Sequence, residues 1–211
     1  MHTFPKFRRA RRLLLILFPA VVCILILCLL RACPAPDRDL SFLSTLEIPD
    51  WIDVQLITPG RDARPGKKLD ALNHIVIHYV GNPGTTAQQN RNYFNNPDTT
   101  VSAHFVVGLD GEIIQCVPLA ERAVASNQAN ADSISIEVCH PDEEGKFTDE
   151  SCQALIRLCA WLCQNCGLDA DALIRHYDVS GKACPVYYVN YPEAWESFKS
   201  DVAVYLSAMK P

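Results

Sequence analysis

The stretch HIVIHYV, His74 to Val80, decides the fold. It is short, apolar and rich in β-branched residues, with DALN before it and GNPG after it. A continuous apolar run between two turn signals favours a buried strand over a helix. We therefore expect a central strand at 74–80, with His78 as a polar residue near its end.

Three further segments on the C-terminal side of this run predict the rest of a sheet. Two β-rich runs within 103–117 are joined at Asp110-Gly111, the strongest local signal for a hairpin. SISIEV at 133–138 alternates strictly between apolar and other residues, and a brief strand is expected at 173–175.

Helices are expected between and after these strands. Thr86 is a candidate N-cap for AQQNRNYF, and Thr148 is one for an amphipathic helix that ends at Gly167. A last helix carries four apolar residues on one face: Trp195, Phe198, Val202 and Tyr205. Strands interleaved with helices, together with one hairpin, predict a single α/β domain with a mixed central β-sheet flanked by helices.

The N-terminal region has the pattern of a membrane segment. Residues 1–12 hold five Lys/Arg and no acid, and the apolar run 13–30 would span roughly 27 Å as a helix, close to the hydrocarbon thickness of a bilayer. The positive charge predicts a cytoplasmic N-terminus and an anchor that holds the rest of the chain outside. A linker is expected at 31–48 and the folded domain at 49–211. A cleaved signal peptide, or a lipoprotein anchor at Cys33, remains open.

Charge argues against one class of partner. Six of the 19 Lys/Arg lie at or before Arg31, whereas all 24 acids follow it, so the exported part carries an excess of about eleven negative charges. Such a surface repels phosphate backbones, and we expect no nucleic-acid partner.

The segment RHYDVSGKACP, Arg175 to Pro185, brings a histidine and a cysteine together on what we interpret as one loop. With His78, the side chains of His176 and Cys184 make two imidazoles and one thiolate, a suitable set of protein ligands for a catalytic zinc. The fourth tetrahedral position would take a water, whose pKa zinc can lower to about 7. We therefore predict that Zn²⁺ is the cofactor.

Two other residues suit hydrolysis at such a site. Glu137 is the one acid within the expected strands that qualifies to handle the protons of the water, because burial and a nearby cation set the pKa of a strand carboxylate. The ammonium of Lys182, next to the Gly181 turn, would face the negative charge that develops on an attacked carbonyl.

Four motifs, in this order, resemble the zinc N-acetylmuramoyl-L-alanine amidases, the family of phage amidase lysozymes and animal peptidoglycan recognition proteins. They are IVIHY (75–79), SAHFVVGLDGEIIQ (102–115), SISIEV (133–138) and RHYDVSGKACP (175–185), and the resemblance covers about residues 50 to 205. It implies that His78, His176 and Cys184 bind zinc and that Lys182 stabilises the transition state. The implied substrate is peptidoglycan, cut between N-acetylmuramic acid and the L-alanine of the stem peptide.

The sequence departs from this family at two places. Ala103 stands where the phage enzymes have a catalytic tyrosine, although Glu137 matches the strand glutamate that a cytosolic bacterial branch uses instead. AVASNQ (123–128) replaces the Trp-His-Ala-Gly stretch of many relatives, which puts the substrate contacts made through that stretch in doubt.

Two other functions are compatible with parts of the sequence. A receptor on the same fold would bind muropeptides without cutting them, but such members of the family usually lack the zinc cysteine, which here is Cys184. An iron–sulfur or redox protein would use the C-x3-C-x2-C spacing of Cys159, Cys163 and Cys166. Those cysteines share the apolar face of the expected helix, so we interpret them as core residues. The remaining strand histidines, His74, His104 and His140, are interpreted as structural or supporting residues rather than ligands.

Overall fold

The computed structural model describes residues 39–209. The expected anchor at 13–30 and the start of the expected linker lie outside this part of the chain. Within 39–209, no helix is both long and apolar enough to cross a membrane.

The centre of the domain is one six-stranded sheet with the strand order β1-β4-β3-β5-β2-β6. Its strands are β1 (Asp53–Val54), β2 (His74–Tyr79), β3 (Phe105–Val107), β4 (Ile113–Gln115), β5 (Ser133–Val138) and β6 (Leu173–Arg175). Only the β3–β4 hairpin is antiparallel among these pairs, and β2 lies between the parallel strands β5 and β6. The predicted mixed sheet is therefore confirmed, with the 74–80 run close to its centre.

Eight helical segments complete the described part of the chain. They are η1 (Ser41–Ser44), α2 (Ala87–Phe94), η2 (Asn127–Ala131), α3 (Asp149–Cys166), η3 (Ala170–Ala172), α4 (His176–Ser180), α5 (Val186–Asn190) and α6 (Pro192–Ala208). Thr86 and Thr148 cap α2 and α3 as expected, and Gly167 ends α3 in the left-handed conformation with φ 58°. The segment from Arg175 to Pro185, expected as one loop, instead contains the short helix α4, and a second short helix, α5, follows it directly.

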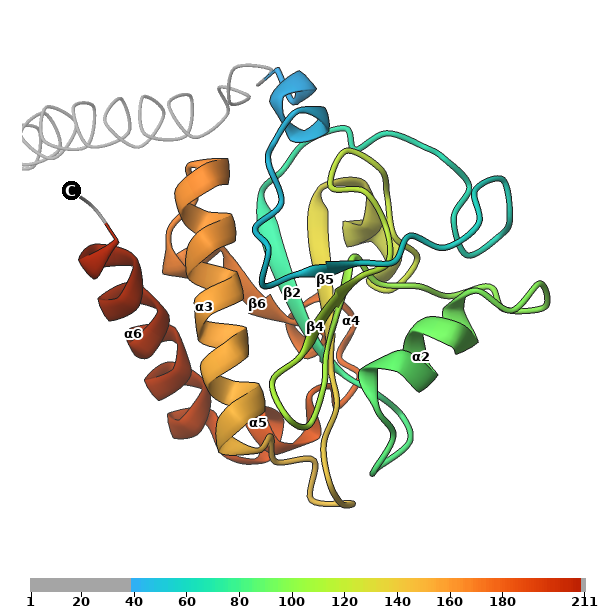
Figure 1. Ribbon diagram of the computed structural model, residues 1–211. Coiled ribbons are helices and arrows are strands. Elements are labelled where there is room, and N and C mark those ends of the chain that lie inside the picture. The colour runs from blue at the N-terminus through green and yellow to red at the C-terminus, as the bar shows by residue number, and fades with distance from the viewer. Residues whose placement is uncertain (1–38, 210–211) are drawn as a thin grey trace, which may run out of the picture. The chain divides into compact units, whose positions relative to one another are not determined.

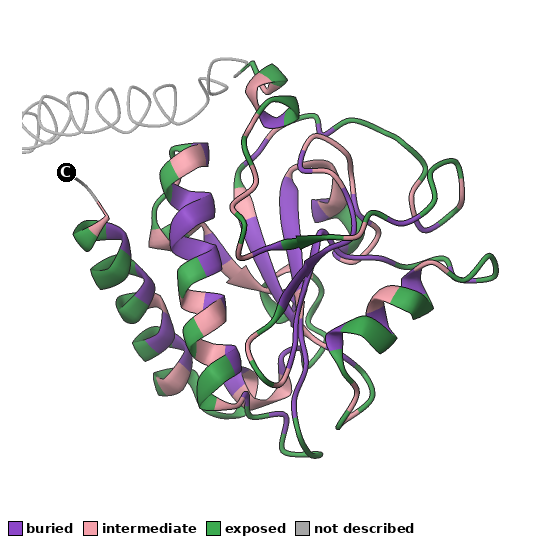
Figure 2. Ribbon diagram, in the orientation of Figure 1, coloured by how far each residue is buried: buried purple, intermediate pink, exposed green. Residues whose placement is uncertain are grey.

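The helices cover the sheet in two layers (Figure 1). Helices α3 and α6 lie on one face, while α2 lies on the other. Strand alternation creates this division, because Ile134 and Ile136 of β5 pack towards α3, whereas Val106 of β3 packs towards α2. Figure 2 shows that β2 and β5 are almost wholly buried, so the side chains at the ends of these two strands are carried by the interior of the sheet.

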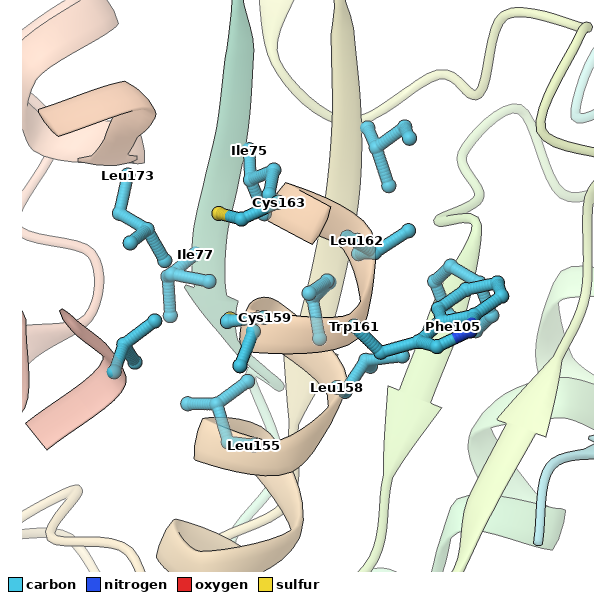
Figure 3. Close-up of a cluster of buried hydrophobic side chains, with 14 of the residues drawn as sticks. Ile75, Ile77, Phe105, Leu155, Leu158, Cys159, Trp161, Leu162, Cys163 and Leu173 are labelled. Atoms are coloured by element: carbon cyan, nitrogen blue, oxygen red, sulfur yellow. The ribbon is translucent and has the colours of Figure 1, made fainter. Parts of the chain in front are cut away.

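The larger core lies between α3 and the sheet (Figure 3). Leu155, Leu158 and Leu162 of α3 meet Ile75 and Ile77 of β2 there, and all five are fully buried. Cys159 and Cys163 lie in the same cluster, pointing at aliphatic side chains. These cysteines are core residues, as their helical spacing predicted, and the geometry of a cluster-binding loop is not present at α3.

The folded domain begins earlier in the chain than Pro49. Leu43, in η1, is only 4% exposed and belongs to the larger core. Further on, the guanidinium of Arg157 in α3 lies 4.0 Å from the ring centroid of Trp51. The linker expected over 31–48 is therefore too long, because its last residues are part of the domain. The sequence predicted a linker here because the apolar residues that pack on the core are few and lie among polar ones.

Candidate metal centre

The site begins with two neighbouring strands in register. His78 of β2 pairs directly with Glu137 of β5, and the strands are parallel. Paired residues of parallel strands point to the same side of the sheet, so the imidazole and the carboxyl group lie side by side. The His78 Nδ1 and Glu137 Oε1 atoms are 3.9 Å apart.

Helix α4 and the residues after it bring two more groups to this point. His176 is the first residue of α4, and its ring centroid lies 4.6 Å from that of His78. Cys184 follows α4, with its Sγ atom 3.9 Å from Nδ1 of His78. One potential ligand atom from each of His78, His176 and Cys184 lies within 4.8 Å of the other two. The structure thus brings together all three residues that the sequence predicted as metal ligands.

The chemistry of these atoms fits a metal ion. Both ring nitrogens of His176 are buried without a hydrogen-bond partner, and so is Oε2 of Glu137. Leaving buried polar atoms unpaired is costly, and a cation between them would remove that cost for a nitrogen ligand. Two imidazoles and one thiolate are ligands that zinc favours, and three protein ligands leave one position for a substrate or water.

Burial shifts the pKa of each group at the centre. It lowers the pKa of His78 well below its usual range, and the charges of His176 and Lys182 lower it further. Burial also lowers the pKa of His176, again with help from Lys182. The two imidazoles are therefore held neutral, which is the form that binds metal.

The two acidic groups are shifted in the opposite direction. Burial raises the pKa of Glu137 to about 8, although the nearby ammonium of Lys182 lowers it. Burial and the proximity of Glu137 raise the pKa of Cys184 to about 12. A bound dication would oppose both shifts because it stabilises the carboxylate and the thiolate.

Lys182 lies on the exposed rim of the site, two residues before Cys184. Its charge affects the pKa of His78, His176, Glu137 and Cys184, so its ammonium lies close enough to act on the whole centre. The backbone N–H of Lys182 donates to the Ser180 hydroxyl at the end of α4, which orients the start of this turn.

Sequence reasoning missed the contribution of the AVASNQ stretch. Ser126 Oγ lies 2.9 Å from Nε2 of His78, and the side chain of Gln128 donates to the carbonyl oxygen of Val179 in α4. The stretch therefore supports two of the elements that carry ligand residues. Serine and glutamine have no motif that would reveal this role, and the only signal was that the stretch departs from its relatives.

The other residues singled out from the sequence lie apart from the three ligand atoms. His104 is fully buried, accepts a hydrogen bond at Nδ1 from Ser135 N–H and contacts the Glu121 carbonyl oxygen through Nε2. The nitrogens of His140 lie near the carbonyl oxygens of Val80 and Asp142. Ala103 is buried in the smaller core, so the position of the family's tyrosine offers no functional group.

A mixed α/β domain with two histidines, a cysteine and a partly buried carboxyl group at a strand end has the features of a zinc-dependent hydrolase. A family model for N-acetylmuramoyl-L-alanine amidase matches residues 68–187. The chain belongs to the N-acetylmuramoyl-L-alanine amidase family, as its four motifs predicted.

Known relatives agree with this assignment. BlyA, an N-acetylmuramoyl-L-alanine amidase of Bacillus subtilis strain 168, is 33% identical over 72% of this chain and 46% of its own length. XlyA, another such amidase of that strain, is 31% identical over 74% of this chain and 50% of its own length. The solved catalytic domain of XlyA aligns with a TM-score of 0.64 at 29% identity, over 72% of this chain and 98% of that domain. The chain thus spans about half the length of these curated relatives.

Proposed function

We propose that this protein hydrolyses the amide bond between N-acetylmuramic acid and L-alanine in peptidoglycan. The observation that carries the proposal is the His78–His176–Cys184 group beside Glu137, in a chain of this amidase family. The names of BlyA and XlyA, which describe the same reaction, support it.

The three ligand residues fit a zinc ion, which when bound would polarise the scissile carbonyl and lower the pKa of an attacking water. His78 offers Nδ1, because its Nε2 is engaged by Ser126. The thiol of Cys184 must lose its proton to serve as a ligand, so metal binding by the group is expected to release a proton.

Glu137 is the group that moves protons in this proposal. Its Oε2 atom is buried and has no partner within the described chain, so it is available to accept a proton from the water and to pass it to the departing amine. A carboxyl group whose pKa has been raised to about 8 by burial holds a proton well enough to return it near neutral pH. A cation at the ligands would lower this value towards the range of a general base.

Lys182 carries the remaining role. Its ammonium is exposed on the rim, where an incoming carbonyl would arrive, and its charge reaches the ligands and Glu137. We propose that it stabilises the negative charge on the carbonyl oxygen in the transition state.

We further propose that the amidase acts on the outer side of the cell membrane. The support is the sequence alone, in which the basic residues 1–12 precede the apolar run 13–30. An anchor would hold the acidic domain near an anionic wall that its charge does not attract.

The full-length protein, purified in a mild detergent, tests the reaction on purified peptidoglycan. New L-alanine amino termini and new reducing sugar ends are measured with and without a zinc chelator. We expect amino termini that disappear with the chelator and with Cys184→Ala, and no reducing ends. Cys139→Ala is the matched control, because Cys139 is also buried but lies outside the ligand group.

Two outcomes would reject the proposal. Reducing ends without amino termini would mean that a glycan bond is cut. Bound zinc with neither product would favour the non-catalytic receptor, and retention of muropeptides by Cys184→Ala would then be the next observation to seek.

A further inference from the structure

We propose that Ser126 is a positioning residue that fixes the tautomer and the orientation of His78, so that Nδ1 presents a lone pair to the metal. This inference rests on the proposed zinc site. It gives a function to a stretch in which the sequence differs from its relatives.

The contact itself is short and buried. Ser126 Oγ lies 2.9 Å from Nε2 of His78, and neither residue is more than 1% exposed. Water therefore does not compete for Nε2. The opposite nitrogen, Nδ1, is the one that faces Sγ of Cys184 at 3.9 Å and Oε1 of Glu137 at 3.9 Å.

The neighbouring serine offers a second partner to the same hydroxyl. Ser126 Oγ is 3.1 Å from Oγ of Ser135, and either hydroxyl can donate in this pair. In the proposed arrangement Ser126 donates to Ser135, and its lone pairs face His78. His78 then donates from Nε2–H and has no proton on Nδ1. A neutral imidazole carries only one ring proton, and fixing it on Nε2 leaves Nδ1 as the metal-binding atom.

The backbone that carries Ser126 is itself held in place. The side-chain oxygen of Asn130 accepts hydrogen bonds from the N–H groups of Ala125 and Ser126, at 3.0 and 2.6 Å. The next residue, Asn127, adopts a positive φ of 51°, which turns the chain into η2. Gln128 then bonds to Val179 in α4. Hydrogen bonds on both sides of Ser126 therefore hold the turn that carries it.

The two imidazoles of the centre differ in this respect. Both ring nitrogens of His176 lack a hydrogen-bond partner within residues 39–209, whereas His78 has Ser126. Of the two, only His78 has a side-chain partner that can set its tautomer before a metal arrives. His78 is thus the preorganised ligand, and removal of its partner should weaken the affinity for the metal.

The experiment compares full-length wild-type protein with Ser126→Ala. Nitrogen-15 NMR of the metal-free wild type should show the His78 proton on Nε2, and Ser126→Ala should mix the two tautomers. Competition with a chromophoric chelator should show a zinc affinity about 10- to 100-fold weaker in Ser126→Ala. Ser126→Thr keeps the hydroxyl and should recover most of that affinity.

Ser133→Ala is the matched control. Ser133 is a buried serine on the same side of β5 as Ser135, but its hydroxyl donates to the carbonyl oxygen of Ala129 and not to a ligand residue. It should leave the tautomer of His78 and the zinc affinity unchanged. An equal loss of affinity in Ser133→Ala would attribute the effect to general loosening of the turn and would overturn the proposal.

Three other results also test the proposed role of Ser126. A proton on Nδ1 of His78 in metal-free wild type would overturn the inference without any variant, even if Ser126→Ala failed to fold. Absence of zinc binding by wild type would overturn it as well. Zinc binding with the expected tautomer but no cleavage of peptidoglycan would reject the proposed reaction and leave the role of Ser126 standing.

Discussion

Glu137 is partly buried and has an unpaired carboxyl oxygen, and its place in β5 produces both features. The alternation of SISIEV turns Ile136 and Val138 into the larger core and leaves Glu137 on the side of His78. The sequence predicted this residue correctly as the acid that lies beside the ligands, because alternation and residue type are both local properties. It did not predict Ser126, whose contact with His78 spans 48 positions of the chain.

Replacing Glu137 by Gln should separate proton transfer from metal binding. The amide has nearly the same shape but cannot take up a proton, so we expect amidase activity to fall by about 10²- to 10⁴-fold while zinc is retained. Product release from peptidoglycan and zinc content by atomic absorption measure the two effects. Glu144→Gln, which alters an exposed glutamate, should change neither the amidase activity nor the zinc content. Activity within twofold of wild type in Glu137→Gln would exclude Glu137 as the proton carrier.

His104 should make the stability of the fold depend on pH. Burial lowers the pKa of His104 to about 4, whereas an unfolded histidine has a pKa near 6.5. Between these values the unfolded chain binds a proton that the folded chain does not. The contribution of neutral His104 to the free energy of unfolding is therefore fully present above about pH 6.5. It is lost as the pH drops towards 4, by on the order of 3 kcal/mol.

Urea unfolding at pH 7 and pH 5 checks this prediction. His104→Gln removes the titrating ring, so the difference in unfolding free energy between the two pH values should become smaller than in wild type. Both proteins are compared in the presence of chelator, because bound metal would add its own pH dependence. An unchanged difference would mean that His104 does not carry this titration.

At the scale of elements, the sequence predicted what caps and periodicity define. Thr148, the apolar face of α3 and Gly167 predicted both ends of α3, the longest helix within residues 39–209, and Asp110-Gly111 predicted the hairpin. Helices α4 and α5, of five residues each, are too short to show a helical period. They are held by packing and by Arg175, whose guanidinium makes a bidentate contact with Asp178 of α4 and donates to the carbonyl oxygen of Tyr188 in α5.

The Thr148 cap gives a test at this scale. Its hydroxyl accepts from the backbone N–H of Ser151 and donates to the carbonyl oxygen of Leu109, so it ties α3 to the hairpin loop. Thr148→Ala should lower the free energy of unfolding by about 1–2 kcal/mol, measured by urea denaturation. Thr45→Ala, which removes an exposed hydroxyl bonded within its own turn, should cost less than about 0.5 kcal/mol. Equal losses of unfolding free energy in the two variants would show that the Thr148 cap stabilises the fold no more than an exposed hydroxyl does.

At the scale of the whole molecule, the α/β class followed from the order of elements, but the order of strands in the sheet did not. Strand β5 lies between β3 and β2 because of pairings between distant segments, and β1, with only two residues, gave no periodic signal. The anchor at 13–30 stays a prediction. The start of the domain was placed too late because Phe42, Leu43 and Leu46, which belong to or pack against the larger core, are scattered among polar residues.

Zinc should stabilise the whole fold if the ligands come together only in the native state. At a free concentration about 1,000-fold above the dissociation constant, a metal bound only by the folded chain adds about 4 kcal/mol, which raises the melting temperature on the order of 10 °C for a domain of this size. Calorimetric scans with zinc and with chelator measure the shift. Cys184→Ala should lose most of it, whereas Cys139→Ala should keep it even if its baseline is lower. A shift of equal size in both variants would place the stabilising ion elsewhere.

The spacing between His78 and Cys184, 106 positions along the chain, also has a consequence for protein synthesis. A growing chain releases β2 long before α4 and Cys184, and parallel pairing of β2 with β5 and β6 must wait for both partners. No partly synthesised chain that ends before Cys184 can assemble the three-residue ligand group. The proposed metal centre is therefore completed only after Cys184 has been synthesised, so truncated products that end before Cys184 should lack the proposed amidase activity.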